Sequence, residues 1–194
     1  MGRDAHLLHY AIGGAAEDVN FFAVVEGPET WQSDRWIAAA GPGEGLASFQ
    51  GWHPAVIVMI SAGWIDKRWG LLVVDQPRRW HRHQVVPIGD AAHGMLPHQG
   101  QGANTTIEDA ATLASLLPPA SKNDLAAVFL RYGALLRSRT RAIQRSSLAT
   151  NRALHLFDDA LATFARDSRL PRFPEEFGWI HAFDATHEAT RALD

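Results

Sequence analysis

The amino-acid sequence predicts a mixed fold of the α/β class, in part α+β, whose β-sheet is incomplete. Three observations support this prediction: a β-hairpin pattern at the N-terminus, a short apolar strand that runs into a glycine-rich loop and a helix, and a long amphipathic helix behind them. The chain has 194 residues, of which 46% are hydrophobic and 20% charged. This is an ordinary globular composition, and the length allows one sizeable buried core.

The composition also excludes several classes of protein. The chain has no cysteine, which excludes disulfide scaffolds, thiolate metal sites and cysteine nucleophiles. Its formal charge of −3 disfavours a nucleic-acid binder. No apolar run approaches the roughly 20 residues of a membrane span, and the first residues lack the apolar stretch of a signal peptide. We therefore expect no nucleic-acid partner, no membrane association and a cytoplasmic location.

The N-terminal third is expected to combine strands with short helices. Apolar and aromatic runs over residues 6–12 and 19–25 predict a hairpin whose turn begins at Gly13 and Gly14. Residues 29–50 are expected to form a helical connector that breaks at Gly41-Pro42-Gly43. Pro54 fits the first turn of a helix that ends at about Ala62.

Two further strands are expected, over residues 69–74 and 84–89. The second leads through a glycine-rich loop into a helix that begins near Gly102 and ends at Leu117-Pro118-Pro119. The expected buried face of this helix consists of apolar residues at spacings of three and four, namely Ala103, Ile107, Ala110, Ala114 and Leu117.

A long helix is expected from about Asp124 to about Phe164, straight or bent. Its apolar side would be formed by Leu125, Val128, Tyr132, Leu135 and Ala142. The tail that follows is expected to be loop-rich, because Pro171 and Pro174 punctuate it.

These strands supply too little sheet for a self-contained domain. Strands without neighbours leave unpaired backbone edges and exposed apolar area, which natural proteins avoid. Either the chain dimerises through these edges or it is part of something longer.

The residues whose types and spacing most strongly indicate a ligand-binding site lie between the strand at 84–89 and the helix at Gly102. Asp90 ends a strand, where its carboxylate can accept hydrogen bonds from ligand hydroxyls. The small side chains of Ala91 and Ala92 leave room for a ligand to lie against the backbone. Gly100 and Gly102 allow a close backbone approach. The N–H groups at the start of the next helix favour negative charge. The pattern therefore predicts a pocket for a polyhydroxyl ligand that carries an anionic or electron-rich ring.

This loop resembles the second flavin-binding motif of FAD-dependent aromatic hydroxylases, the class A flavoprotein monooxygenases, and most of all the salicylate hydroxylase group. The motif is Gly89-Asp90-Ala91-Ala92-His93, then Pro97, then residues 100–104. The resemblance extends over nearly the whole chain. It includes residues 6–10 and 20–25, Gly51-Trp52-His53-Pro54, the long helix from Arg131 to Asn151, and the aromatic segment from Trp179 to Ala185.

The resemblance implies a role for most residues of the loop. Asp90, flanked by Gly89 and Ala91, would bind the ribityl chain of FAD. The backbone N–H groups of Ala103 and Asn104, next to Gly100 and Gly102, would face the pyrimidine carbonyl of the flavin ring. Pro97 would lie beside the reacting edge of the ring, where the substrate is hydroxylated, and His98 is a candidate to face the substrate.

The family's N-terminal G-x-G-x-x-G turn, which holds the FAD pyrophosphate, has no counterpart in this sequence. The chain is therefore interpreted as the C-terminal half of a monooxygenase: a fragment, a product of a wrong gene start, a decayed copy or one chain of a split enzyme. Three regions are expected: part of a substrate domain at 1–75, the end of an FAD-binding domain of the glutathione-reductase type at 76–120, and a helical region at 121–194.

Two functions from different classes follow. The first is an FAD-dependent monooxygenase part that hydroxylates a small aromatic or related ring with NAD(P)H and O2, completed by a missing N-terminal half or by a second chain. The alternative is a truncated, non-catalytic copy that acts as a structural or interaction domain.

Other conspicuous residues have simpler interpretations. His93 is expected to support the loop by hydrogen bonding, and Glu108 and Asp109 to complement the dipole of their helix. His6 and His9 lie on opposite faces of their strand, and His9 is a candidate to face the substrate. Residues 78–83 and the six arginines of 131–152 are interpreted as solvated basic surface; His81 and His83 lack the carboxylate partners of a metal site.

Overall fold

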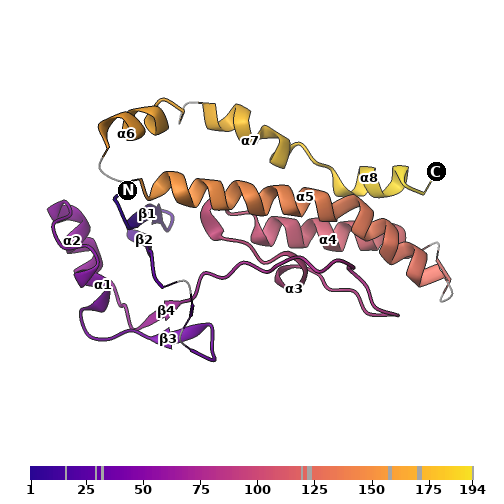
Figure 1. The fold of residues 1–194 in the computed structure, drawn as a ribbon, viewed down its shortest axis with the longest axis horizontal. Coiled ribbons are helices and arrows are strands. Elements are labelled where there is room, and N and C mark those ends of the chain that lie inside the picture. The colour runs from indigo at the N-terminus through magenta and orange to yellow at the C-terminus, as the bar shows by residue number, and fades with distance from the viewer. Residues whose placement is uncertain are drawn as a thin grey trace. The chain divides into compact units, whose positions relative to one another are not determined.

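The computed structural model describes residues 1–15, 17–28, 30–31, 33–118, 120–121, 124–156, 159–169 and 172–193, without the side chain of Phe173. The chain forms two compact units. The first unit comprises Met1–Leu71 and Arg152–Asp167, and the second comprises Leu72–Asn151 and Ser168–Asp194. Figure 1 shows the order of the elements along the chain.

The first unit contains the predicted hairpin. β1 (Ala5–Ile12) pairs antiparallel with β2 (Asp18–Val25), in a register that places Ala5 opposite Val25. Gly13 begins the turn with φ of 86°, a left-handed conformation that favours glycine. The base of the hairpin packs on a small core in which Ala5, Phe49 and Ile60 are buried.

The helical connector predicted over residues 29–50 is largely wrong. Among the described residues of this range, only α1 (Glu44–Ala47) is helical, while β3 (Ile37–Ala39) pairs antiparallel with β4 (Lys67–Trp69). The backbone of β3 thus finds its partners in a distant strand, a pairing that local propensity does not encode. The next helix, α2 (Pro54–Ala62), has the predicted bounds, and His53 Nδ1 accepts the N–H of Ala55 at 3.2 Å.

Neither of the two further strands forms as predicted. β4 ends at Trp69, where the predicted strand begins, and residues 84–89 make only an isolated bridge between Arg82 and Val85. A strand needs a neighbour for its backbone N–H and C=O groups. In the described part of the chain, β3 pairs with β4 only as far as Trp69, and no strand lies beside residues 84–89. Both segments therefore run as extended, partly exposed apolar chain.

The second unit is mainly helical. Its long helices are α4 (Gly102–Leu116) and α5 (Leu125–Leu154), which lie side by side in Figure 1. The core between them contains Trp80, Leu116, Val128, Tyr132 and Leu136, all buried. Within the described ranges, no helix is both long and apolar enough to cross a membrane.

The long helix ends earlier than expected and buries a partly different face. α5 stops at Leu154, and residues 160–167 form a separate helix, α6 (Ala160–Asp167). Val128 and Tyr132 are buried as predicted, but Ala142 is exposed. The buried face continues instead through Ile143 and through three polar residues, Thr140, Gln144 and Ser147.

The predicted buried face of α4 is wrong for this chain. Ala103, Ala110, Ala114 and Leu117 are exposed, and Ile107 is 66% exposed. The helix instead buries a more polar face: Thr105, Asp109, Thr112 and Leu116. Partners from other segments determine this choice, because Gly89 and His93 bind Asp109 Oδ2 and a hydrophobic core surrounds Leu116.

The tail is helical where loops were expected. It forms α7 (Phe173–His181) and α8 (Ala185–Arg191), and α8 packs on α4. Pro174 stands at the start of α7, where a proline does not interrupt the helix, and the side chain of Asp184 accepts the N–H of His187 at 2.9 Å to cap α8. Pro171 lies outside the described residues.

Candidate functional site

The loop with the predicted chemistry lies in the second unit and begins at Gly89. This residue precedes the single-turn helix α3 (Asp90–His93) with φ of 57° and ψ of −139°. A Cβ atom at this position would lie 2.9 Å from Thr106 Oγ1 of α4. Both the dihedral angle and the close approach therefore require glycine.

Asp90 occupies the first turn of α3 with an exposed side chain. Its carbonyl oxygen accepts the N–H of Gly94 at 3.1 Å, which closes the turn. The N-cap of α3 is Gly89, which has no side chain, and among the described residues no hydrogen bond to the Asp90 carboxylate is found. Its carboxylate is therefore available at the surface of the loop. Ala91 beside it is also exposed, while Ala92 is buried beneath the turn.

A buried carboxylate holds the loop from behind. Asp109 of α4 is fully buried, and its Oδ2 accepts the backbone N–H of Gly89 at 2.7 Å and lies 2.7 Å from His93 Nε2. The expectation that His93 supports the loop by hydrogen bonding is confirmed. The expectation that Asp109 serves mainly the helix dipole is wrong, since it faces the interior and is paired there.

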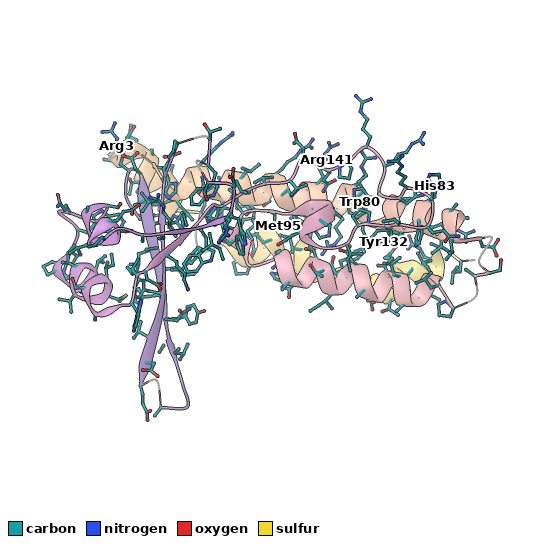
Figure 2. All side chains as sticks on the ribbon, turned by 90° about the horizontal axis from the view of Figure 1, so that it is seen from below. Arg3, Trp80, His83, Met95, Tyr132 and Arg141 are labelled. Atoms are coloured by element: carbon teal, nitrogen blue, oxygen red, sulfur yellow. The ribbon has the colours of Figure 1, made fainter. Side chains whose placement is uncertain are left out.

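Aromatic side chains form the wall beside this pair. The ring centroid of Trp80 lies 5.6 Å from that of His93 and 5.4 Å from that of Tyr132, and Figure 2 shows Trp80 and Tyr132 close together. Burial raises the pKa of the Tyr132 phenol, and the nearby Asp109 carboxylate raises it further, so the phenol stays protonated. The segment 78–83 is thus only partly solvated surface, because Trp80 is buried in the core.

The second half of the loop leads into α4. Leu96 is buried, and η1 (Pro97–Gln99) ends at Gly100, which has φ of 63°. α4 then begins without a side-chain cap, and added Cβ atoms at Gly100 and Gly102 would meet only open space. The first N–H groups of a helix lack intrahelical acceptors and carry the positive end of its dipole. At this end of α4, Ala103 and Asn104 are exposed.

The buried polar face of α5 fastens the loop. Gln144 Nε2 donates to the carbonyl oxygens of Val74 at 3.0 Å and Gly94 at 2.9 Å, and Ser147 Oγ donates to Leu96 O at 2.7 Å. Gln99 Nε2 in turn donates to Ser146 Oγ at 2.6 Å. Sequence reasoning missed these contacts. The signal that could have found them is a run of polar residues at helical spacing on an otherwise apolar helix face.

The structure brings most of the predicted site residues together. Gly89–Ala91 and the segment from Pro97 to Asn104 form one continuous loop, with Pro97 exposed at its rim. His98 is half-buried and borders a cavity of about 160 Å³, which it shares with Gln101, directly before α4, and with residues of η1, α5 and α7.

The histidines of the first unit are arranged differently. His9 lies exposed in β1, opposite Phe21 of β2. His6 is buried, and its Nδ1 lies 2.7 Å from His155 Nε2. The role of His9 towards a substrate stays a prediction.

Known proteins resemble this chain at the level of sequence. A family model described as an FAD binding domain matches residues 69–143. The chain is 34% identical to the 3-amino-4-hydroxybenzoate 2-monooxygenase PtmB3 of Streptomyces platensis, over 98% of this chain and 48% of that protein. It is 32% identical to a salicylate hydroxylase of Pseudomonas putida, over 99% of this chain and 46% of that protein.

Solved structures agree with the sequence relatives. A salicylate hydroxylase in complex with substrate superposes with a TM-score of 0.79 and 28% identity, over 96% of this chain and 47% of that one. CtdE, in complex with FAD and a substrate, shares the fold with a TM-score of 0.77 and 23% identity, over 99% of this chain and 46% of that one. The chain spans about half the length of these relatives. By sequence and by fold, the chain is similar to about half of the length of FAD-dependent aromatic monooxygenases.

Proposed function

We propose that this chain is the C-terminal part of a flavoenzyme that hydroxylates a small aromatic or related ring with NAD(P)H and O2. The proposal rests on one observation: the same loop contains an exposed carboxylate, Asp90, and leads into the uncapped N-terminus of α4. A carboxylate suits the hydroxyl groups of a ribityl chain, and a helix N-terminus suits an electron-rich ring carbonyl.

The shape of the loop supports FAD as the ligand. Added Cβ atoms at Gly100 and Gly102 would enter open space, so the backbone there is accessible to a flat ring. The Gly89–Ala91 turn would bind the ribityl hydroxyls through Asp90. The N–H groups of Ala103 and Asn104 would hold the pyrimidine carbonyl, where the dipole of α4 stabilises negative charge. FAD, when bound, supplies the redox chemistry that activates oxygen, and the protein orients it.

The residues at the rim of the loop have roles in substrate binding under this proposal. Pro97 presents a rigid apolar edge, because η1 is tied to α5 through Gln99 and Ser146. A small aromatic substrate would lie against this edge and exclude water from the ring. His98, which follows directly, is a candidate for a polar contact with the substrate, and His9 is a second candidate from β1. The matched relatives include a salicylate hydroxylase and a 6-hydroxynicotinate 3-monooxygenase, which supports this substrate class.

A partner half is part of the proposal. The apolar face of α4 is exposed at Ile107 (66%), and the neighbouring extended segment exposes Val85 (71%) and Ile88 (43%). Exposed apolar faces and unpaired extended backbone mark surfaces that another segment covers. The N-terminal, dinucleotide-binding half of a glutathione-reductase-type FAD domain would supply the missing strands and cover α4. It would also contribute the contacts to the FAD pyrophosphate and to NAD(P)H, in a cytoplasmic enzyme.

The same exposed surface supports a second candidate, a truncated non-catalytic copy that acts as a structural or interaction domain. In that case a second copy of the chain, or another protein, would cover the apolar face of α4. The two candidates differ in whether flavin binds at the Asp90 loop.

The deciding experiment is a visible absorption spectrum of the purified chain after incubation with FAD and desalting. We expect bound flavin in the parent chain, its loss in Asp90→Ala, and its retention in a control, Asp18→Ala, in which an exposed carboxylate of the hairpin is removed. Equal retention in Asp90→Ala and the parent would contradict the role of Asp90.

If the chain alone stays colourless, the same comparison is made after fusion to the N-terminal half of the salicylate hydroxylase relative. In this fusion, salicylate should stimulate NAD(P)H oxidation unless Asp90 is replaced. A folded fusion that never retains flavin would favour the non-catalytic candidate.

A further inference from the structure

The buried carboxylate of Asp109 has a function that the dipole of α4 does not explain. The side chain lies seven residues after the first residue of the helix and is completely buried. The helix dipole acts mainly within the first turn. Burying a carboxylate is costly unless hydrogen bonds compensate for the lost hydration. Here two hydrogen-bond contacts come from the loop that carries Asp90, and the Tyr132 phenol of α5 also interacts with the carboxylate.

Asp109 holds this loop at both ends of α3. Its Oδ2 accepts the N–H of Gly89, directly before Asp90, and pairs with His93, the last residue of the turn. A helix of four residues is too short to be stable alone, because helix nucleation is unfavourable. The conformation of α3 therefore depends on external contacts, and the Asp109 carboxylate supplies two of them.

A second contact from α4 restrains the same residue. Gly89 approaches Thr106 so closely that a Cβ atom would lie 2.9 Å from its hydroxyl oxygen. Asp109 and Thr106 are three residues apart and thus share one face of the helix. The N-terminus of α4 starts only a few residues earlier, and Asn104 and Asp109 are separated by about 7.5 Å along the axis.

We propose that Asp109 is a positioning residue, which fixes Asp90 relative to the N-terminus of α4. One rigid helix would then hold the ribityl contact and the ring contact of the flavin at a constant distance from each other. This inference rests on the proposed function, since it assigns Asp109 a role in preparing the FAD site rather than in touching FAD.

The surroundings of Asp109 indicate that its hydrogen bonds position the loop rather than only add to the stability of the fold. His93 Nδ1 is buried without a hydrogen-bond partner in the described structure. Tyr132 of α5 presents a phenol that its raised pKa keeps protonated beside the carboxylate. An apolar side chain of similar volume would avoid the cost of burying this charge. We therefore infer that the buried carboxylate serves to fix the conformation of the loop, which an apolar side chain could not do.

The test compares three variants of the chain. Asp109→Leu removes the acceptor while keeping most of the volume, and Asp109→Asn keeps an oxygen that can accept from Gly89 and His93. Glu108→Ala is the matched control, because it removes the neighbouring carboxylate, which pairs with Arg139 and makes no described contact with the loop. Two quantities are measured: hydrogen exchange of the backbone amides of residues 89–94 without FAD, and the Kd for FAD from quenching of flavin fluorescence.

We expect Asp109→Leu to accelerate amide exchange at 89–94 about tenfold and to weaken FAD binding about tenfold. Asp109→Asn should restore both quantities to within about threefold of the parent. Glu108→Ala should lower the Tm without changing either. This pattern separates positioning from stability, because a purely structural role would make the effects follow the Tm.

The inference is overturned if Asp109→Leu leaves the exchange of 89–94 unchanged, or if Glu108→Ala has the same effect at the same loss of Tm. The exchange measurement needs no flavin, so it decides the inference even if the parent chain alone fails to bind FAD, in which case the fusion experiment decides the proposed function. If FAD binds and its Kd is equal in Asp109→Leu and the parent, the positioning role is wrong.

Discussion

Arg139 and Glu108 form a largely buried, two-pronged ion pair between α5 and α4. Arg139 Nε donates to Glu108 Oε2 at 2.8 Å, and Nη2 donates to Oε1 at 2.7 Å. The same guanidinium donates to Ile180 O at 2.7 Å and lies 4.2 Å from the ring centroid of Phe183. One side chain therefore ties together two long helices and the tail.

We expect Arg139→Met to lower the free energy of unfolding by about 2–4 kcal/mol. The substitution leaves Glu108, whose side chain is 16% exposed, without its partner and removes the donor to Ile180. Urea unfolding followed by circular dichroism measures the change. Arg145→Met is the control, since Arg145 is exposed on the same helix. Equal stability of Arg139→Met and the control would show that the ion pair is replaceable.

Gly102→Ala should separate flavin binding from stability. Gly102 begins α4, and a Cβ atom there meets only open space, so alanine should preserve or raise the Tm. Under the proposed function the same methyl group would enter the space of the flavin ring and weaken binding about tenfold or more. Gly178→Ala is the control, because Gly178 is also a helical glycine with open space around it. Undiminished flavin retention in Gly102→Ala would place the ring elsewhere.

The stability of the first unit should fall as the pH drops below about 6.5. Burial lowers the pKa of His155, with opposing contributions from Glu26 and Asp4. A histidine whose pKa is lower in the folded state binds fewer protons there than in the unfolded state. Its contribution is therefore complete above the unfolded pKa and is lost as the pH falls through the folded value. The bond to His6 acts in the same direction, because one ring must accept.

Urea midpoints at pH 7.5 and pH 5.5 test this dependence. His155→Asn should reduce the difference between the two midpoints, whereas His187→Asn should leave it unchanged, since His187 is exposed on α8. An unchanged difference in His155→Asn would show that other groups cause the acid sensitivity.

The exposed face of α4 should matter for assembly and not for folding. Ile107→Glu replaces a side chain that is 66% exposed. The free energy of unfolding of the isolated chain should therefore change by less than about 0.5 kcal/mol. In the fusion with an N-terminal half, the same change should prevent stable flavin retention. Leu161→Glu, at a position on α6 that is 80% exposed, serves as the control. Normal flavin retention in the Ile107→Glu fusion would mean that this face is not covered.

Elements with local signals could be predicted from the sequence. The hairpin of β1 and β2 follows from two alternating apolar runs around Gly13, and α2 follows from Pro54 and the apolar run behind it. The loop from Gly89 to Asn104 was also visible, because its glycines, its aspartate and the following helix are neighbours along the chain. The same signals were present in the tail, where Pro174 and Asp184 start helices that were expected to be loops.

Elements that depend on distant partners could not be predicted in this way. The apolar stripe of α4 predicted a buried face at Ile107, but the helix buries Asp109, because Gly89 and His93 bind the Oδ2 of that carboxylate. Residues 84–89 have the composition of a strand and still form none, since a strand requires a neighbour and no described segment of the chain supplies one there.

The sequence by itself determined the resemblance to FAD-dependent aromatic monooxygenases and the positions of the carboxylate and glycines of the loop, because these depend on residue type and on short spacings. Only the tertiary structure decided how the loop is held: by Asp109 from α4, and by Gln144 and Ser147 from α5. Such contacts join residues 20 to 51 positions apart. They form when packing brings polar groups together in a region without water, where each group must find a partner.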